Sequence, residues 1–495
     1  MPAAPARPPP GVPGVPGVPG VPGVRLLGYP DPRAMGSDPD PGDAAPAATI
    51  PASGQATGSN EHWKGRTMAQ SELDRREFLA AAGRGAALGA LGLGGLAVLP
   101  RRARAAARAV SPNEQIGLGI IGVGGLGRDH HLPIVMGRGE LRLLAVCDVD
   151  RQHVEAARAD AGGAIDAYDD YRRLLDRSDI DAVLIATPDH WHALAAIHAC
   201  QAGKDVYCEK PLTRTVAEGR ALVQAARRYG RVFQTGSQQR SDRRFRHACE
   251  LVRNGAIGTL RHVRTALPAG PSAGWEPSQD PPEHLDWNAW LGPAPWAEYT
   301  PKRCHFTFRW FEDYSGGTLT DWGAHHNDIA QWGVGAELSG PVEVRGDAVW
   351  PADGLYETPL HFDLHYRYAN GVTLHCTSKG RNGVTFEGSA GTIFVTRGAI
   401  EAEPPEILDT PPGSGPVALY ESDDHHGNWI DCMKTRAKPI CDVEIGHRSV
   451  SVCHIGGIAL RLGRTLAWDP GAERFVGDEE ANRLLSRPMR RPWIL

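Results

Sequence analysis

The chain has 495 residues, of which 41% are hydrophobic and 22% are charged, and its formal net charge is −5. This length and composition allow two or three globular domains with a substantial core. The small net charge, and the lack of a long basic run in the body of the chain, argue against nucleic acid as a partner. The nine cysteines are irregularly spaced and form no CxxC pair, which argues against a disulfide framework and a structural zinc site.

The front of the chain differs from the rest. Residues 1–67 are dominated by proline, glycine and alanine and contain the repeat GVPGVPGVPGVPGV at residues 11–24. Such a segment cannot build a core, so we expect it to be disordered. Residues 68–109 carry the pair Arg75 and Arg76, then a weakly apolar stretch and small residues of the A-x-A type. This order predicts a twin-arginine signal peptide, with an Ala/Gly-rich helix or a membrane anchor as the alternative.

The export signal predicts where the protein works. We expect the twin-arginine machinery to export the folded protein to the periplasm or another extracytoplasmic compartment, the route expected for enzymes that acquire a cofactor in the cytoplasm. Because a signal belongs at an N-terminus, a second hypothesis is that translation begins at Met68.

Residues 113–236 alternate between apolar runs and helical patterns. Clear strands are predicted within IGLGIIGVGGLG (116–127), LRLLAVCDVD (141–150), DAVLIATP (181–188) and KDVYCE (204–209). Continuous apolar strands separated by helices indicate a parallel sheet that is covered on both faces. The predicted fold class is therefore α/β, with an N-terminal Rossmann dinucleotide-binding domain.

The first strand runs into a glycine motif. Gly122, Gly124 and Gly127 fit the pattern G-x-G-x-x-G, in which the glycines allow a tight turn and a close approach of the backbone to a pyrophosphate. Asp148 closes the next strand, where an acid would bind the adenosine ribose. The negative charge of Asp148 would repel a 2′-phosphate, which favours NAD, but Arg151 leaves NADP open.

The third strand ends in ATPDHWH (186–192). Ligands of an open parallel sheet bind beyond the carboxyl ends of its strands, so Thr187, Pro188 and His190 are predicted to contact the cofactor. Asp189 has an equally good interpretation as the cap of the following helix.

The fourth strand ends in DVYCEKPL (205–212), which places Glu209 and Lys210 at the mouth of the sheet, before Pro211. Burying two charges at a strand end is costly unless they are paired or used.

The glycine motif, ATPDHWH and CEKPL, in this order, resemble the Gfo/Idh/MocA oxidoreductases, a family that includes glucose–fructose oxidoreductase and inositol dehydrogenase. The resemblance runs from about Asn113 to the C-terminus. It implies that Lys210 is catalytic and contacts both the substrate and the nicotinamide ribose, that its bond to Pro211 is cis, and that Glu209 pairs with it or orients it. It further implies a second, α+β domain with a large, mostly antiparallel sheet, and a homo-oligomer, either a dimer or a tetramer.

A second motif, SGGTLTDWGAHHNDIAQW (315–332), contains Asp321, His325 and Asp328, whose spacing puts them on one face of a helix. The family carries a matching Gly-Gly, Asp and His pattern at its substrate site. The resemblance therefore implies that Asp321 binds or orients the substrate and that His325 takes part in proton transfer. A metal site is one alternative reading. A purely structural role is another, for His326 or Asp328.

Residues 237–495 are predicted to form the second domain. HFDLHYRYANGVTLHCTSKG (361–380) alternates around an Asn-Gly turn and indicates an antiparallel hairpin, and residues 425–435 and 447–463 read as helices.

The substrate pocket is predicted from residues inside the two chemical motifs. Trp191 and Trp322 offer flat apolar faces that suit the CH faces of a sugar, and His326 is a further candidate. Most of the other tryptophans are expected to fill the core.

These features predict an NAD(P)-dependent dehydrogenase that oxidises a CH–OH group of a sugar, polyol or related carbohydrate. Lys210, helped by His325, would take the hydroxyl proton. No metal is needed for such a hydride transfer. One alternative is a glycoside hydrolase or lyase that oxidises its substrate transiently with a tightly bound, recycled NAD, which suits an exported enzyme. Another is a non-catalytic sugar sensor, although the presence of Lys210, Asp321 and His325 together argues against it.

Overall fold

The structure is a computed structural model, and it describes residues 115–495. The predicted disordered segment (1–67) and the predicted export signal (68–109) lie outside the described residues. Among the helices of the described part, none is both long and apolar enough to cross a membrane.

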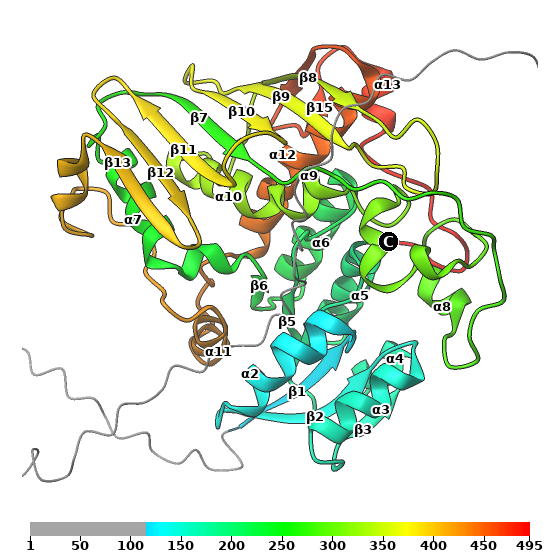
Figure 1. The fold of residues 1–495 in the computed structure, drawn as a ribbon. Helices are drawn as coiled ribbons and strands as arrows, with labels where there is room; N and C mark the ends of the chain where they lie inside the picture. The colour runs from blue at the N-terminus through cyan, green and yellow to red at the C-terminus, as the bar shows by residue number, and fades with distance from the viewer. Residues whose placement is uncertain (1–114) are drawn as a thin grey trace, which may run out of the picture. The chain divides into compact units, whose positions relative to one another are not determined.

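The first half of the described chain forms a six-stranded sheet with the order β3-β2-β1-β4-β5-β6, in which all neighbouring strands are parallel (Figure 1). The strands are β1 (Ile116–Ile121), β2 (Leu141–Cys147), β3 (Asp166–Tyr168), β4 (Ala182–Ile185), β5 (Asp205–Cys208) and β6 (Phe233–Thr235). The Rossmann prediction is confirmed. Sequence analysis missed the two edge strands, β3 and β6, because three residues are too few to show a periodic pattern.

Helices cover both faces of this sheet, as the continuous apolar strands predicted. Side chains alternate along each strand, so Val183 and Ile185 pack on one face while Ala182 and Leu184 pack on the other. The first face is covered by α4 (Tyr171–Leu175), α5 (Asp189–Gln201) and α6 (Val216–Arg228). The second face is covered by α2 (Leu132–Met136), α3 (Arg151–Asp160) and α11 (His425–Thr435), with the π-helix η2 (Gly127–His131) leading into α2.

A nine-stranded sheet follows, with the order β13-β12-β11-β7-β10-β9-β8-β14-β15. Its neighbours are antiparallel except for the parallel pair β10 and β7, which confirms the predicted α+β domain. The strands are β7 (Leu260–Ala266), β8 (Glu343–Val349), β9 (His361–Arg367), β10 (Thr373–Thr377), β11 (Gly383–Gly388), β12 (Thr392–Thr396), β13 (Ala399–Glu403), β14 (Leu466–Asp469) and β15 (Arg474–Phe475). The predicted hairpin is the β9–β10 pair, and Gly371 at its turn has a φ of 86°. The domain boundary at residues 236 and 237 stays a prediction.

Long helices cover one face of the large sheet. The core on this face is formed with α7 (Arg243–Arg253), α10 (Gly323–Val334) and α12 (Val443–Leu462). The other face is open, and the side chains of β9 alternate between buried and partly or fully exposed. The shorter elements are η3 (Gln238–Ser241), α8 (Trp287–Leu291), η4 (Pro301–Arg303), η5 (His305–Trp310), α9 (Thr318–Asp321), η6 (Pro405–Asp409) and α13 (Glu479–Arg483).

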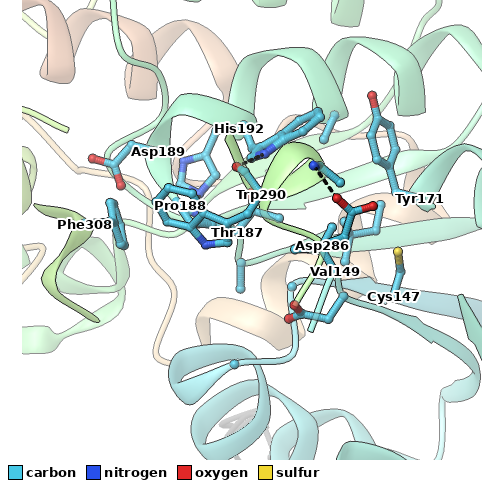
Figure 2. A pocket seen from close by; sticks show the side chains of 18 of the residues that line it. Cys147, Val149, Tyr171, Thr187, Pro188, Asp189, His192, Asp286, Trp290 and Phe308 are labelled. Atoms are coloured by element: carbon cyan, nitrogen blue, oxygen red, sulfur yellow. Dashed lines mark hydrogen bonds between the residues drawn. The ribbon is translucent and has the colours of Figure 1, made fainter. Parts of the chain in front are cut away.

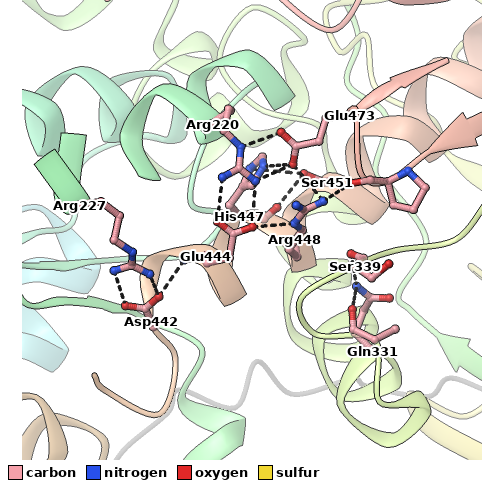
Figure 3. A network of polar contacts seen from close by, with 12 residues as sticks. Arg220, Arg227, Gln331, Ser339, Asp442, Glu444, His447, Arg448, Ser451 and Glu473 are labelled. Carbon is pink, nitrogen blue, oxygen red and sulfur yellow. Dashed lines mark hydrogen bonds and ion pairs between the residues drawn. The ribbon is translucent and has the colours of Figure 1, made fainter. Parts of the chain in front are cut away.

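Helix α12 joins the two sheets. Its residues Val443 and Val450 belong to the core of the Rossmann sheet, whereas its later residues pack under the large sheet. Figure 3 shows the polar contacts beside this junction, where Arg220 of α6 donates hydrogen bonds of 2.8 Å to both Glu444 and Glu473. The junction fixes the Rossmann strand ends relative to α9 and α10, which carry the second chemical motif.

Candidate active site

The glycine motif forms a tight loop at the carboxyl end of β1. Gly122 has a φ of 86°, and a Cβ atom there would lie 2.7 Å from the Thr187 nitrogen. A Cβ atom on Gly127 would lie 2.0 Å from the Gly122 oxygen, so neither position accepts a larger residue without movement. Gly124 is less confined, because its nearest neighbour would be the His153 ring at 3.3 Å. Because its glycines have no side chains, the loop leaves its backbone accessible to a pyrophosphate.

Asp148 lies beside this loop, just after the end of β2. Its carboxylate accepts hydrogen bonds from the backbone amides of Val123 (2.9 Å) and Asp150 (3.0 Å). The predicted ribose-binding acid is thus held against the glycine loop, with its side chain on the wall of a cavity.

This cavity lies over the carboxyl ends of the Rossmann strands and has a volume of about 790 Å³, which suits a large organic ligand. Figure 2 shows Thr187 and Pro188 on its wall, with Tyr171 and Asp286 further along it. The predicted cofactor or substrate residues on its wall are Gly122, Gly124, Asp148, Thr187, Pro188, Trp191, Glu209 and Lys210. Further walls come from the segments around α8 and η5, which contribute Asp286, Asn288, Ala289, Trp290, His305, Phe306, Phe308 and Arg309.

The cavity fits a dinucleotide in two respects besides its size. Gly122, Gly124 and Gly125 of the glycine loop lie on the cavity wall and have no side chains that would keep a pyrophosphate away from the backbone. In addition, Thr187 Oγ1 is buried on the cavity wall without a hydrogen-bond partner among the described residues, so a bound ligand could supply one.

His190 does not contact the cavity, contrary to the sequence prediction. Its ring is buried against Trp290 and Tyr314, with Nε2 3.0 Å from the Trp290 carbonyl oxygen, and burial lowers its pKa to about 3. His192 lines the cavity instead. Its two ring nitrogens lie 2.7 Å from the Pro211 oxygen and 2.8 Å from the Thr187 oxygen. His192 therefore ties together the loops that follow β4 and β5.

Lys210 follows β5, and its peptide bond to Pro211 is cis, as the resemblance implied. The amine donates to the Asp321 carboxylate at 2.7 Å and to the Asp321 carbonyl at 3.0 Å. Arg309 Nε lies 3.4 Å from the same carboxylate oxygen. Burial opposes the ionisation of Asp321, but the charges of Lys210 and Arg309 outweigh it and lower the pKa of its carboxyl. The lysine is thus fixed at the cavity by a residue from the other part of the fold.

Glu209 does not pair with the Lys210 amine, which was one of the two roles that the resemblance implied for it. Its carboxylate lies 3.0 Å from His131 Nε2 and accepts from Gln238 Nε2 at 2.8 Å, while the backbone amide of Lys210, not its amine, donates to it at 3.2 Å. Burial raises the pKa of Glu209, but the His131 hydrogen bond and the charge of Lys210 outweigh this and lower it to about 2. Glu209 therefore anchors the chain beneath Lys210, and the amine itself pairs with Asp321.

The second motif is not one continuous helix. Helix α9 ends at Asp321 and α10 begins at Gly323. His325 is buried in the first turn of α10 and its Nδ1 has no hydrogen-bond partner among the described residues. Burial lowers the pKa of His325 well below its ordinary value, and the charges of Lys210 and Arg397 add to this effect. The ring is therefore a neutral imidazole near pH 7, and the positive charge of Lys210 helps to keep it unprotonated.

The remaining residues of this motif have other partners. His326 is buried with Nε2 2.7 Å from Asn382 Oδ1, and Trp322 lies under the Arg397 guanidinium, 4.9 Å from it. Like Asp321 and His325, neither lines the cavity, in contrast to their predicted role in the substrate pocket. Asp328 forms two 2.8 Å hydrogen bonds with Arg240 inside the core, which is the structural role considered as an alternative.

An arm formed by residues 490–493 closes one side of the cavity, which sequence reasoning did not predict. Arg490 donates to the Gly292 carbonyl at 3.0 Å, and the Trp493 ring meets Trp191 edge-on at 4.9 Å. All four arm residues line the cavity. The sequence shows only a short tail of arginine, proline and apolar residues, and no local pattern reveals where it packs.

The fold and the site together define a dinucleotide-binding oxidoreductase. Two family models match the chain. The "Oxidoreductase family, NAD-binding Rossmann fold" model matches residues 116–237, and the "Oxidoreductase family, C-terminal alpha/beta domain" model matches residues 274–495. Both describe domains of the Gfo/Idh/MocA oxidoreductases, and the chain belongs to this family.

Similar proteins include the oxidoreductase YrbE of Bacillus subtilis, 27% identical over 237 residues, which are 48% of this chain and 58% of that protein. An inositol 2-dehydrogenase of Salmonella paratyphi B is 31% identical over 141 residues, 28% of this chain and 42% of that protein. The chain thus spans about half the length of these curated relatives. The solved structure of aldose–aldose oxidoreductase from Caulobacter crescentus is 23% identical, with a TM-score of 0.54 over 71% of this chain and 99% of that one, a likeness of fold.

Proposed function

We propose that the protein oxidises a CH–OH group of a sugar, polyol or related carbohydrate, with Lys210 as the group that takes the hydroxyl proton. The observation that carries this proposal is the position of the Lys210 amine, which lies on the wall of the dinucleotide-sized cavity and is held there by Asp321. When bound, NAD would supply the hydride acceptor. Gly122, Gly124, Asp148 and Thr187 would hold it.

The proton chemistry rests on three side chains. Lys210 can accept the hydroxyl proton of the substrate only when its amine is neutral. In its ammonium form it is paired with the Asp321 carboxylate. His325 is neutral and has a free ring nitrogen, so it is suited to exchange a proton or to orient the substrate hydroxyl. Asp321 positions the amine.

NAD is the proposed cofactor in preference to NADP. Asp148 lines the cavity, and its negative charge opposes a ribose phosphate. Arg151, the residue that left NADP open, donates its guanidinium to the Glu283 carbonyl at 3.0 Å and does not line the cavity.

We further propose that the cofactor is held tightly. The support is the arm at residues 490–493, which has to move before a large ligand in the cavity can leave on that side. A retained cofactor also favours a second candidate function, in which transient oxidation of a glycoside leads to its cleavage and the cofactor is reduced and oxidised within one turnover.

Two experiments test these proposals. Mass spectrometry of the purified full-length chain should detect a co-purifying NAD. A panel of sugars, polyols and glycosides should then produce NADH absorbance in proportion to oxidised product if the first function holds. A cleaved glycoside without net NADH would favour the second, and neither product on any substrate would count against both.

Export and self-association complete the proposal. The support for twin-arginine export is the Arg75–Arg76 motif, and changing both residues to lysine should retain the protein in the cytoplasm of the producing cell.

The support for a homo-oligomer is the open face of the nine-stranded sheet. Analytical ultracentrifugation should give a dimer or a tetramer, and a monomer at all concentrations would contradict this.

A further inference from the structure

One carboxylate and three imidazoles meet beside the cavity, outside the proposed catalytic residues. Asp150 immediately precedes α3 and His153 lies in the first turn of this helix. His284 lies in the segment before α8, and His305 is the first residue of η5. Two of these residues therefore come from the start of helix α3, beside the Rossmann sheet, and two from the segment that covers the cavity.

The distances within this cluster are those of ligands around an ion. Asp150 Oδ2 lies 3.4 Å from His305 Nε2 and 3.9 Å from His153 Nε2, and all three ligand atoms lie within 4.8 Å of one another. These separations are too long for good hydrogen bonds. Two ligands of a tetrahedral zinc ion, each at about 2.0–2.1 Å from it, lie roughly 3.3 Å apart. The space between the three atoms therefore suits a metal ion.

Neighbouring groups orient the ligand atoms in the way that metal sites require. The second oxygen of Asp150, Oδ1, lies 2.9 Å from His284 Nδ1 and accepts a hydrogen bond of 2.9 Å from the Gln152 amide. The second nitrogen of His153, Nδ1, faces Asp148 Oδ2 at 3.5 Å, which is an electrostatic contact and not a good hydrogen bond. The two hydrogen bonds to Oδ1 fix the direction of the Asp150 carboxylate, as outer contacts do for ligating groups.

The burial of Asp150 and the backbone conformation of His305 also favour a bound metal ion at this cluster. Asp150 is 2% exposed, so its charge is costly unless cations or hydrogen-bond donors compensate for it. His305 has a φ of 49°, a conformation that is uncommon for residues other than glycine, and it directs its imidazole toward Asp150.

We propose that Asp150, His153 and His305 bind a divalent transition-metal ion of the zinc class. Two imidazoles and one carboxylate are a typical ligand set for such an ion. His153 and His305 also line the cavity, so the open coordination position faces the cavity. The ion would tie the covering segment to the Rossmann sheet, a role separate from hydride transfer.

A second group of three residues on the open sheet face provides a matched control. Asp363, His365 and His375 are also close together, but His375 contacts Asp363 directly and its ring stacks on that of His365 at 4.5 Å. The direct contact leaves no space for an ion between His375 and Asp363, although His365 Nε2 lies 3.3 Å from Asp363 Oδ1, so we expect weaker binding there.

The test measures metal binding by the full-length chain after treatment with a chelator. Calorimetric titration with Zn²⁺, and visible absorption with Co²⁺, should reveal one tight site in the wild type. His305→Ala and His153→Ala should each weaken it by about 100-fold or more, and His284→Ala by about 10–100-fold. His375→Ala should leave it unchanged.

Thermal unfolding supplies a second measurement, since Zn²⁺ should raise the Tm of the wild type and of His375→Ala but not that of His305→Ala. Wild-type affinity in His305→Ala, or loss of binding in His375→Ala, would overturn the proposal. So would a wild type without a tight site. Because metal binding is read directly, the result does not depend on whether the proposed oxidoreductase activity is correct.

Discussion

The amine of Lys210 and the carboxylate of Asp321 form a 2.7 Å ion pair across 111 positions of sequence. Lys210 follows a strand of the Rossmann sheet, whereas Asp321 ends a helix beside the large sheet. The pair is largely shielded from water, with the two side chains 13% and 19% exposed, so it holds the amine in one place. The proposed reaction depends on this placement, because a general base must lie within reach of the proton that it removes.

Asp321→Asn tests the positioning role of the carboxylate. The amide keeps the shape of the side chain but loses the charge that holds Lys210, so kcat/KM should fall by about 100-fold, the cost of misplacing a catalytic group. NAD affinity should stay at the wild-type value, as measured by calorimetry. Asp347→Asn, on the exposed face of β8, is the control for a lost carboxylate. A parallel loss of NAD binding would show that Asp321 has a wider structural role.

Asp148→Asn tests the choice of cofactor. The carboxylate is expected to bind the ribose hydroxyls, and loss of charged hydrogen bonds worth about 1.5–3 kcal/mol should weaken NAD binding by about 10–100-fold. NADP should be affected less, since the repulsive charge is removed as well. Titrations of both dinucleotides against the wild type, Asp148→Asn and the exposed control Asp160→Asn would measure this. An unchanged preference for NAD would count against the role given to Asp148.

Substitution of two neighbouring glycines by alanine tests whether the glycine loop is sterically confined at Gly127. In Gly127→Ala the new Cβ atom would lie 2.0 Å from the Gly122 oxygen, whereas in Gly125→Ala it would meet nothing within 4 Å. Gly127→Ala should therefore lower the free energy of unfolding by about 1–3 kcal/mol, the usual cost of overpacking. Gly125→Ala should stay within about 0.5 kcal/mol of the wild type. Equal stabilities in urea denaturation would contradict the tight turn.

Sequence patterns predicted the parts of this site that depend on neighbouring residues. The glycine loop, the acid after β2 and the lysine after β5 each follow an apolar strand, and parallel strands bring such ends to one edge of the sheet. The family resemblance supplied the link between Lys210 and the second motif. These local signals were enough to identify the Rossmann domain and the cavity residues Gly122, Asp148 and Lys210.

The errors concern contacts between distant parts of the chain. The family resemblance implied that Glu209 pairs with Lys210 or orients it, but the carboxylate contacts His131, 78 positions away, and only the backbone amide of Lys210. Along α5 the sequence could not tell which histidine faces the cavity, and the structure selects His192 over His190. The arm at residues 490–493 packs on side chains from three separate segments, and no local pattern encodes such packing.

The ionic network in Figure 3 predicts a pH dependence of stability. Burial raises the pKa of Glu444, but hydrogen bonds from Arg220 and Arg448 outweigh this and lower it to about 2, while Arg220 helps to lower the pKa of Glu473. A carboxylate with a lowered pKa in the folded state stabilises the fold above its unfolded pKa, and this contribution is lost as the pH falls through the folded pKa.

Arg220→Met should accordingly reduce the free energy of unfolding by about 1–3 kcal/mol at neutral pH. The deficit should shrink between about pH 4.5, near the unfolded pKa of glutamate, and pH 2. Arg464→Met removes a more exposed pair with Asp478 and should have little effect at any pH. Urea denaturation across this pH range is the measurement. A deficit that does not change with pH would argue against the network as its source.

The most direct test of the proposed function compares the wild type with Lys210→Ala in two assays on the same preparations. One assay records NADH formation with the active substrate of the panel, and the other records NAD binding by calorimetry. Turnover should fall by about 100-fold or more in Lys210→Ala, as expected when a general base is lost, while NAD affinity stays within a few-fold of the wild type. Wild-type turnover by Lys210→Ala would contradict the account.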